Sequence, residues 1–330
     1  MSNAASETRT GRWIAICAIA ALVPCSLVHA GRTNIEERRP ADPQGEVEIV
    51  NVSGKVEVQG WDRAEVEVSG SVGANVDRVD VSGTGNHTAI HVLSRSAHSW
   101  NSDGEANLLI HVPAKSAVTA SLVSADFKVM SVAGDVKLQS VSGDVSGDVG
   151  GDVRVTTVSG EVRMAARAAK TIEMKTISGD IQLRGGGGAV DITTVSGSAT
   201  VELANVRRGR FKSVSGDLTA ELALAPDGQI ESEAVSGDVS MNFAGAPAAE
   251  FDVQSFSGDI RNCFGPKPVE SRYGPGSRLQ FKNGDGHAQV QIHTKSGDVH
   301  LCAKGMNSGY AAPRPVARVA RLPIVVPYVF

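Results

Sequence analysis

The sequence has few aromatic residues, few cysteines and no large excess of charge of either sign. Phe, Trp and Tyr make up only 4% of its 330 residues, which does not favour a wide core built from large side chains. The formal net charge is −4, so no basic surface is expected and nucleic-acid partners are set aside. No His-Glu-x-x-His, Gly-x-Ser-x-Gly or phosphate-loop motif occurs. Glycine is abundant instead, at 36 residues, which is typical of a turn-rich β structure.

Residues 1–30 have the pattern of a secretory signal peptide. Arg9 and Arg12 precede an apolar run, residues 13–23, that is shorter than the roughly 20 residues a membrane span needs. Small residues then favour cleavage before Gly31. We therefore expect an exported protein of the periplasm or cell surface that is not an integral membrane protein after cleavage. An uncleaved anchor and lipidation at Cys25 are the alternatives, although Pro24 fits a lipidation signal poorly.

Only Cys263 and Cys302 remain once residues 1–30 are removed. An even number of cysteines in an exported chain favours a disulfide, because the compartment is oxidising. The alternative is a pair of buried free thiols.

One tetrapeptide, Val-Ser-Gly-Asp, recurs along the chain and is its most regular feature. From residue 141 onward, successive copies begin 17 to 21 residues apart, except the last, which follows after 39 residues, about twice that period. Glycine at the third position permits the positive φ that a tight turn needs, and Ser and Asp can bond to nearby backbone groups. The motif and its close variants begin at Val132, Val141, Val158, Ile177, Val195, Val214, Val235, Phe256 and Lys295, and their turn glycines are Gly134, Gly143, Gly160, Gly179, Gly197, Gly216, Gly237, Gly258 and Gly297.

Apolar and polar residues alternate on both sides of each turn, as in Val153, Val155 and then Val162, Met164. This period of two predicts strands with one buried and one wet face. Such a unit cannot bury its apolar side alone, so stacked copies are expected to build a continuous core. The sequence predicts an all-β protein, a flattened right-handed β-solenoid of rungs of about 19 residues, each a strand, a Ser-Gly-Asp turn and a strand. A β-propeller with two repeats per blade is the alternative.

The repeat also predicts the organisation of the rest of the chain. Residues 31–45 are expected to be a flexible lead-in, 46–120 an irregular N-terminal part of the solenoid, and 121–303 its regular part. Three prolines mark residues 261–289 as an excursion from the coil, which the disulfide would pin to the last rung. Residues 304–330, rich in Pro and Arg, are expected to be a disordered tail.

The serial Val-Ser-Gly-Asp-Val units, the segments SGKVEVQGWD and LIHVP, and the terminal pattern RNCFGPKP…TKSGDVHLC resemble a bacterial family of β-strand repeats. This putative-adhesin family, a domain of unknown function (4097), is similar over roughly residues 45–303. The resemblance implies a β-solenoid of the bacterial envelope, and the family brings no catalytic residues to carry over.

The turn aspartates are the candidate metal ligands. Stacking would align them along one edge, and a column of carboxylates could bind Ca²⁺. The alternative, which we favour, is that each aspartate serves its own turn, since Glu161 and Ser198 interrupt the column. The candidates are Asp144, Asp180, Asp217, Asp238, Asp259 and Asp298.

Outward charged residues such as Arg154, Glu173 and Asp191 show no sign of converging, so we expect solvated faces and no catalytic or cofactor site. Aromatic residues in irregular segments could stack on sugars or fill the ends of the core; these are Trp61, Trp100 and Tyr273.

The sequence thus favours a non-enzymatic envelope protein, an adhesin or interaction scaffold whose partner is an envelope protein or a polysaccharide. A carbohydrate-active β-helix enzyme, and a scaffold or sensor partner of an envelope signalling system, are the alternatives.

Overall fold

The computed structural model describes residues 33–94, 104–270 and 276–304. They belong to one compact unit. The described residues form 23 strands of one mostly parallel sheet. Among them no helix is long and apolar enough to cross a membrane. The predicted signal peptide and the tail beyond residue 304 lie outside the described residues.

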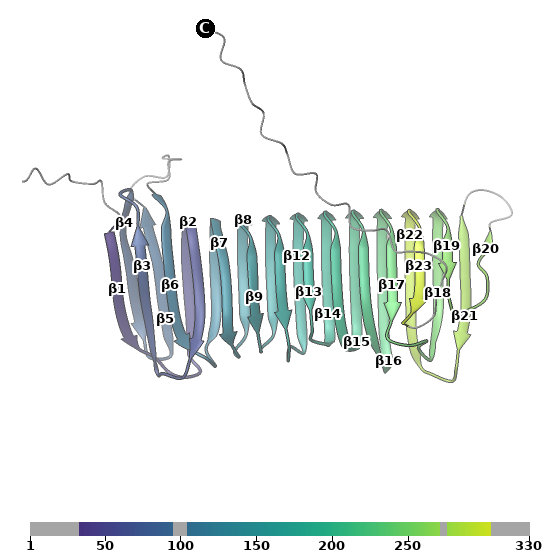
Figure 1. Ribbon diagram of the computed structural model, residues 1–330, viewed down its shortest axis with the longest axis horizontal. Coiled ribbons are helices and arrows are strands. Elements are labelled where there is room, and N and C mark those ends of the chain that lie inside the picture. The colour runs from purple at the N-terminus through teal and green to yellow at the C-terminus, as the bar shows by residue number, and fades with distance from the viewer. Residues whose placement is uncertain (1–32, 95–103, 271–275, 305–330) are drawn as a thin grey trace, which may run out of the picture. The chain divides into compact units, whose positions relative to one another are not determined.

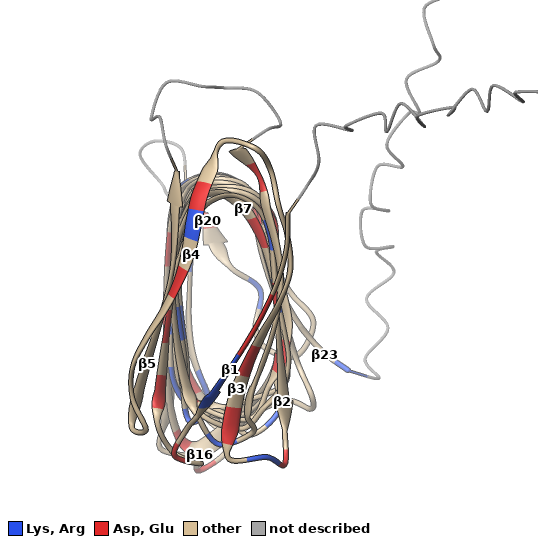
Figure 2. Cartoon of the chain, turned by 90° about the vertical axis from the view of Figure 1, so that its left-hand side faces the viewer, with Lys and Arg blue, Asp and Glu red and all other residues tan. Residues whose placement is uncertain are grey.

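The sheet folds into two walls that face each other (Figure 2). The first wall contains β4 (Val76–Thr84), β5 (His87–Ser94), the first parts of β2 (Glu46–Trp61) and β7 (Ala117–Val132), β8 (Val136–Ser142), β10 (Val153–Ser159), β12 (Thr171–Ser178), β14 (Gly188–Ser196), the last parts of β15 (Ala199–Ser215) and β16 (Leu218–Ser236), β22 (Ala288–Ser296), β18 (Ala249–Ser257), β21 (Ser277–Asn283) and β20 (Val269–Glu270), in this spatial order.

The second wall contains β1 (Thr33–Pro40), β3 (Glu65–Val72), β6 (Ala106–Pro113), the last parts of β2 and β7, β9 (Val145–Val149), β11 (Val162–Ala166), β13 (Ile181–Arg184), the first parts of β15 and β16, β17 (Val239–Phe243), β23 (Val299–Ala303) and β19 (Ile260–Asn262). The chain passes along the first wall, turns, and returns along the second; each such pass is called a rung.

Rungs stack in parallel register, so equivalent residues form columns. Val153 is paired with Val136 on one side and Ile172 on the other. Inward columns hold the core, in which Val155, Met174 and Ile192 are nearly inaccessible to solvent. The two walls therefore bury one continuous core, because every second side chain of each strand points between them.

At both ends, a rung that is distant in sequence is inserted between two others. The rung of β22 and β23 lies between that of β16 and β17 and that of β18 and β19. In the same way, β2 has β7 on one side along its whole length. On its other side lies β5 in the first wall and β6 in the second. Only part of the solenoid order thus follows the order of the sequence (Figure 1).

Antiparallel strands close both ends of the parallel stack. β1 and β3, and β4 and β5, pair antiparallel at the N-terminal end. The expectation of a flexible lead-in at residues 31–45 is wrong for residues 33–40, because these extend along β3 and satisfy its free edge. At the other end the predicted excursion, residues 261–289, contains β20 and β21, and β21 pairs antiparallel with β18.

Four phenylalanines close the C-terminal end of the core. Phe251 stacks on Phe281 at 4.6 Å between ring centres, and Phe243 and Phe264 meet Phe251 edge-on. Aromatic side chains thus cover the core where the stack ends and no further rung follows, while Phe127 and Phe211 lie buried within the stack.

Candidate functional site: the turn edge and the first wall

The tetrapeptides lie on one edge of the folded sheet, between the first and the second wall, which we call the turn edge. Serines at the second position pair in register from rung to rung, for example Ser178 with Ser196 and Ser196 with Ser215. The turn edge consists of residues 52–55, 123–126, 141–144, 158–161, 177–180, 195–198, 214–217, 235–238, 295–298 and 256–259, in spatial order.

One predicted copy of the motif does not belong to this edge. The residues that begin at Val132 follow the second wall, so Gly134 and Asp135 lie on the opposite edge. The turn-edge copy of that rung is 123–126, Val-Ser-Ala-Asp, which the sequence search missed because alanine replaces the glycine. The stacking register, which a four-residue pattern does not contain, decides which edge a turn occupies.

The turn glycines meet two separate demands. Seven of the predicted glycines have φ between +112° and +156°, whereas φ at Gly134 and Gly258 lies outside the positive range. Nevertheless, a Cβ at Gly258 would lie 2.1 Å from the carbonyl oxygen of Gly297 in the neighbouring rung. Close stacking therefore demands glycine even where φ does not. The seven are Gly143, Gly160, Gly179, Gly197, Gly216, Gly237 and Gly297.

The turn aspartates connect rungs. The backbone N–H of Asp238 donates to Oδ1 of Asp217 at 2.9 Å, and the N–H of Asp298 donates to Oδ1 of Asp238 at 2.8 Å. The expectation that each aspartate serves its own turn is thus corrected, because parallel stacking brings the N–H of the next rung closer. The aspartates that accept such bonds are Asp126, Asp144, Asp180, Asp217, Asp238 and Asp298, and Asp259 donates its N–H at the end of the column.

This use of the carboxylates weakens the calcium alternative. Glu161 does not continue the column but binds Arg163 and Gln182 with its side chain. Among the residues that the structure describes, no three His, Cys, Asp or Glu side chains are grouped so that they could hold a metal ion. The column is built to accept N–H groups, and a cation would have to compete with them.

The first residues of the turn-edge tetrapeptides form an exposed apolar row that the sequence analysis did not identify. These side chains are 41–52% exposed up to Val235, and Phe256 is 68% exposed at the end of the row. Lys295 interrupts it between these two positions. The alternation of the preceding strand continues to this residue and points its side chain outward, as in β10, where Val153, Val155 and Thr157 are buried and Val158 is exposed. We call the following residues the valine row: Val52, Val123, Val141, Val158, Ile177, Val195, Val214, Val235 and Phe256.

Charged side chains on the first wall pair across rungs. Glu173 accepts a hydrogen bond from Lys175 at 2.5 Å and forms an ion pair with Arg154 at 2.8 Å. The Lys175 bond outweighs the opposing effect of burial and lowers the pKa of the Glu173 carboxyl. The hydrogen bond from Lys212 lowers the pKa of Glu233 in the same way. These residues hold one another ionised and do not leave a carboxyl poised for proton transfer.

A shallow hollow of about 210 Å³ opens on the first wall beside these pairs, and we call it the Arg208 hollow. A β-bulge at Arg207 shifts the register of β15 and places Arg208 in the same column as Gln229 and Gln289. The side chains of Arg208, Gln229, Gln289 and Gln291 form no hydrogen bond or ion pair with described residues, whereas Arg210 binds Glu231 at 3.1 Å. The hollow is lined by Arg208, Gly209, Arg210, Gln229, Ile230, Glu231, Gln289 and Gln291.

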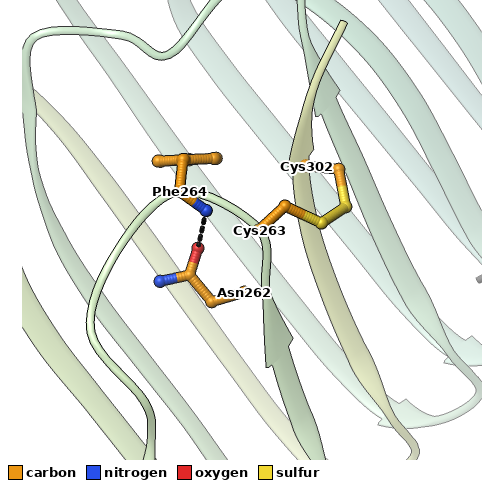
Figure 3. Close-up of a disulfide and its surroundings, with 4 residues drawn as sticks. All are labelled: Asn262, Cys263, Phe264 and Cys302. Carbon is orange, nitrogen blue, oxygen red and sulfur yellow. Dashed lines mark hydrogen bonds between the residues drawn. A yellow bond between two sulfur atoms is a disulfide. The ribbon is translucent and has the colours of Figure 1, made fainter. Parts of the chain in front are cut away.

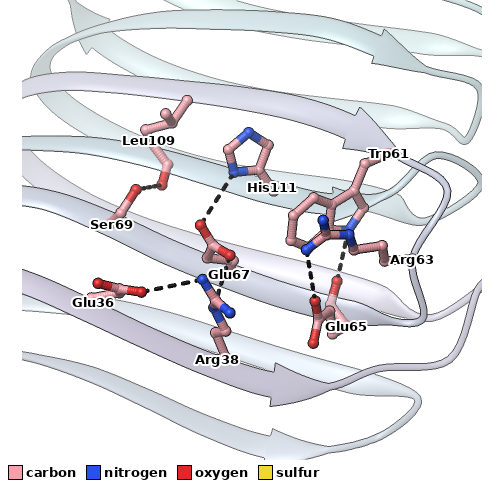
Figure 4. A network of polar contacts seen from close by, with 9 residues as sticks. All are labelled: Glu36, Arg38, Trp61, Arg63, Glu65, Glu67, Ser69, Leu109 and His111. Atoms are coloured by element: carbon pink, nitrogen blue, oxygen red, sulfur yellow. Dashed lines mark hydrogen bonds and ion pairs between the residues drawn. The ribbon is translucent and has the colours of Figure 1, made fainter.

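Trp61 belongs to a polar cluster near the N-terminal end (Figure 4). Its ring stacks on His111 at 4.8 Å, and its Nε1–H donates to the backbone oxygen of Glu65. Arg63 Cζ lies over the same ring, 4.7 Å from its centre, and Glu67 is 3.9 Å from His111 Nδ1. Trp61 therefore packs within the N-terminal end of the sheet. The other two aromatic candidates, Trp100 and Tyr273, lie outside the described residues.

A disulfide joins Cys263, just after β19, to Cys302 in β23 (Figure 3). The backbone N–H of Cys263 also donates to the oxygen of Leu301. The predicted bond therefore connects the last rung of the stack to the inserted rung beside it.

Comparisons with solved structures return proteins of similar size at low sequence identity. A putative adhesin from Bacteroides fragilis is 9% identical, with 83% of this chain and 98% of that chain covered and a TM-score of 0.42. A putative cell adhesion protein from Clostridium sporogenes is 10% identical, with 82% and 100% covered and a TM-score of 0.25. A putative lipid binding protein from Parabacteroides distasonis is 15% identical, with 80% and 96% covered and a TM-score of 0.39. No curated protein matches the chain.

The family model of the toastrack domain DUF4097 matches residues 45–302, which include every rung of the parallel stack. The chain therefore belongs to the toastrack DUF4097 family.

Proposed function

We propose that the protein is a non-enzymatic adhesin or interaction scaffold of the bacterial envelope, exported to the periplasm or cell surface. Its two walls belong to one right-handed coil of rungs of about 19 residues, the hand that connections between parallel strands nearly always take. A rigid coil of this kind presents the same outward columns over its whole length, which suits a long, repetitive partner.

The Arg208 hollow is the observation that indicates which kind of partner the protein binds. Arg208 offers a guanidinium that no described carboxylate neutralises, and Gln229, Gln289 and Gln291 offer amide donors and acceptors beside it. A guanidinium recognises a carboxylate through two parallel hydrogen bonds, while amides suit hydroxyl groups. The partner with both groups is an acidic envelope polysaccharide, and the hollow has room for about one sugar unit.

The enzyme alternative has less support at the same place. Hydrolysis of a glycosidic bond generally uses two carboxyl groups on opposite sides of the bond. Glu231 is the one carboxylate that lines the hollow, and Arg210 binds it. Binding without turnover is the expected behaviour.

Binding of uronate-containing polysaccharides to the immobilised protein tests the proposal. Arg208→Ala is expected to weaken binding by about 10-fold or more, because a charge-assisted hydrogen bond contributes roughly 1.5–3 kcal/mol. Arg207→Ala is the matched control, since it removes the same charge from the adjacent exposed residue that does not line the hollow. An equal loss of binding in both variants would mean that the polysaccharide responds only to the net charge of the protein. Release of sugar fragments by the parent protein would favour the enzyme alternative.

A further inference from the structure

The valine row leaves nine apolar side chains in solvent along a single edge of the sheet, Val52 to Phe256 in space. Large continuous apolar patches are rare on soluble monomers and mark contact surfaces. Neither the Asp column nor the turn geometry needs an exposed branched residue at the first position. From this surface we infer that the turn edge is a contact between two copies of this chain, which lie side by side with their rungs parallel and their valine rows facing.

The spacing of the row selects the partner. The valines repeat once per rung, so the row has the spacing of neighbouring β-strands, about 4.8 Å. A second copy has the same spacing and can match the row at every rung except that of Lys295, whereas an unrelated surface would match it at few positions. A row of this length with a column on either side supplies the roughly 20–30 residues a side of an ordinary stable interface.

Charge determines the relative direction of the two copies. The turn-edge aspartates follow the valine row on the side of the second wall, and the residues two positions before the row, such as Lys175 and Lys212, lie on the side of the first wall. Two antiparallel copies would place one aspartate column against the other. Two parallel copies, related by a twofold axis along the row, place each aspartate column against the residues of the first wall.

In the parallel arrangement, Lys175 faces Asp180 of the second copy and Lys212 faces Asp217. His293 faces Asp298, and Glu233, facing Asp238, is the like-charged exception. The parallel arrangement thus replaces contacts between aspartate columns by two Lys–Asp pairs, with one like-charged pair against them. A twofold axis along the row also brings each valine next to the same valine of the other copy, and Lys295 next to Lys295 as a second like-charged contact.

Single cysteines in the row test this geometry with the full-length chain. Val158→Cys, Val195→Cys and Val235→Cys are each expected to form a self-linked dimer on mild oxidation, because each residue lies on the axis. Thr200→Cys, exposed on the second wall, is the control and should remain monomeric. The parent protein, which has no introduced cysteine, is oxidised in parallel to show any links that form through Cys17 and Cys25. Absence of self-links at Val158→Cys and Val235→Cys would overturn the proposal, and links between these two variants in a mixture would indicate antiparallel copies centred on Val195.

Sedimentation measurements provide a second readout that needs no cross-link. The parent protein should sediment as a dimer at micromolar concentration, and Val195→Lys combined with Val214→Lys should weaken dimerisation by roughly 100-fold, since two buried aliphatic contacts become charged. Thr200→Lys should leave the dimer intact, and unchanged circular dichroism would show that the variants fold. A monomeric parent, with or without added polysaccharide, would overturn the proposal while leaving the polysaccharide site of the first wall untouched.

Discussion

Replacing Gly216 with valine should destabilise the protein by about 4 kcal/mol or more, which places it among the most damaging single substitutions. A Cβ at this position would lie 2.2 Å from the carbonyl oxygen of Gly197 in the neighbouring rung. The backbone also has φ of +144°, which a β-branched residue adopts only with strain. Relief would require two rungs to separate, and this would break the parallel register on both sides of the turn.

Gly245→Val is the matched control for this substitution. A Cβ at Gly245 would meet no atom within 4 Å, so the same change there should alter stability by no more than about 0.5 kcal/mol. Thermal unfolding followed by circular dichroism measures both variants. If Gly216→Val melted with the parent protein, the close stacking of the turn edge would be incorrect.

Loss of the disulfide is the second large effect. Replacing Cys263 and Cys302 with serine should lower the free energy of unfolding by about 4 kcal/mol, the chain-entropy value for a closed loop of 39 residues. The bond ties the inserted rung to the last rung, so its removal should loosen β18 to β23 first. Denaturant unfolding of the parent and the double variant measures the difference.

A reductant provides the control for this comparison. It should destabilise the parent to the level of the double variant and leave the double variant unchanged. Equal stability of the parent and the double variant would mean that strand pairing alone holds the inserted rung.

The repeat made the strands, the turn edge and the inward columns predictable. Alternation around each tetrapeptide identified buried residues such as Val155 and Met174, because successive side chains of a strand point to opposite faces of the sheet. The same alternation points the first residue of each motif outward, but a single outward valine gives no sign of a surface until the rungs are stacked, so the valine row was not predicted. It also assigned Gly134 to the wrong edge, because both edges use short glycine-containing turns.

The insertion of rungs could not be predicted from spacing. The interval of 39 residues before Lys295 is about twice the period, but it gives no sign that the segment contains β21, which runs antiparallel to β18. Which rungs become neighbours depends on long-range pairing that local patterns do not record. The Arg208 hollow depends likewise on a bulge and on columns from three rungs, and no motif signals it.

The Arg208 hollow requires the inserted order of rungs, which also places Lys295 within the valine row, and paired cysteines measure that order directly. Ser236 is in register with Ser296, and Ser296 with Ser257. Neighbouring parallel strands lie about 4.8 Å apart, within disulfide reach, whereas a strand two positions away is not. Peptide mapping of oxidised double variants should show bonds for Ser236→Cys with Ser296→Cys and for Ser296→Cys with Ser257→Cys. A bond between Ser236→Cys and Ser257→Cys instead would mean that the rungs follow the order of the sequence, and would contradict the arrangement.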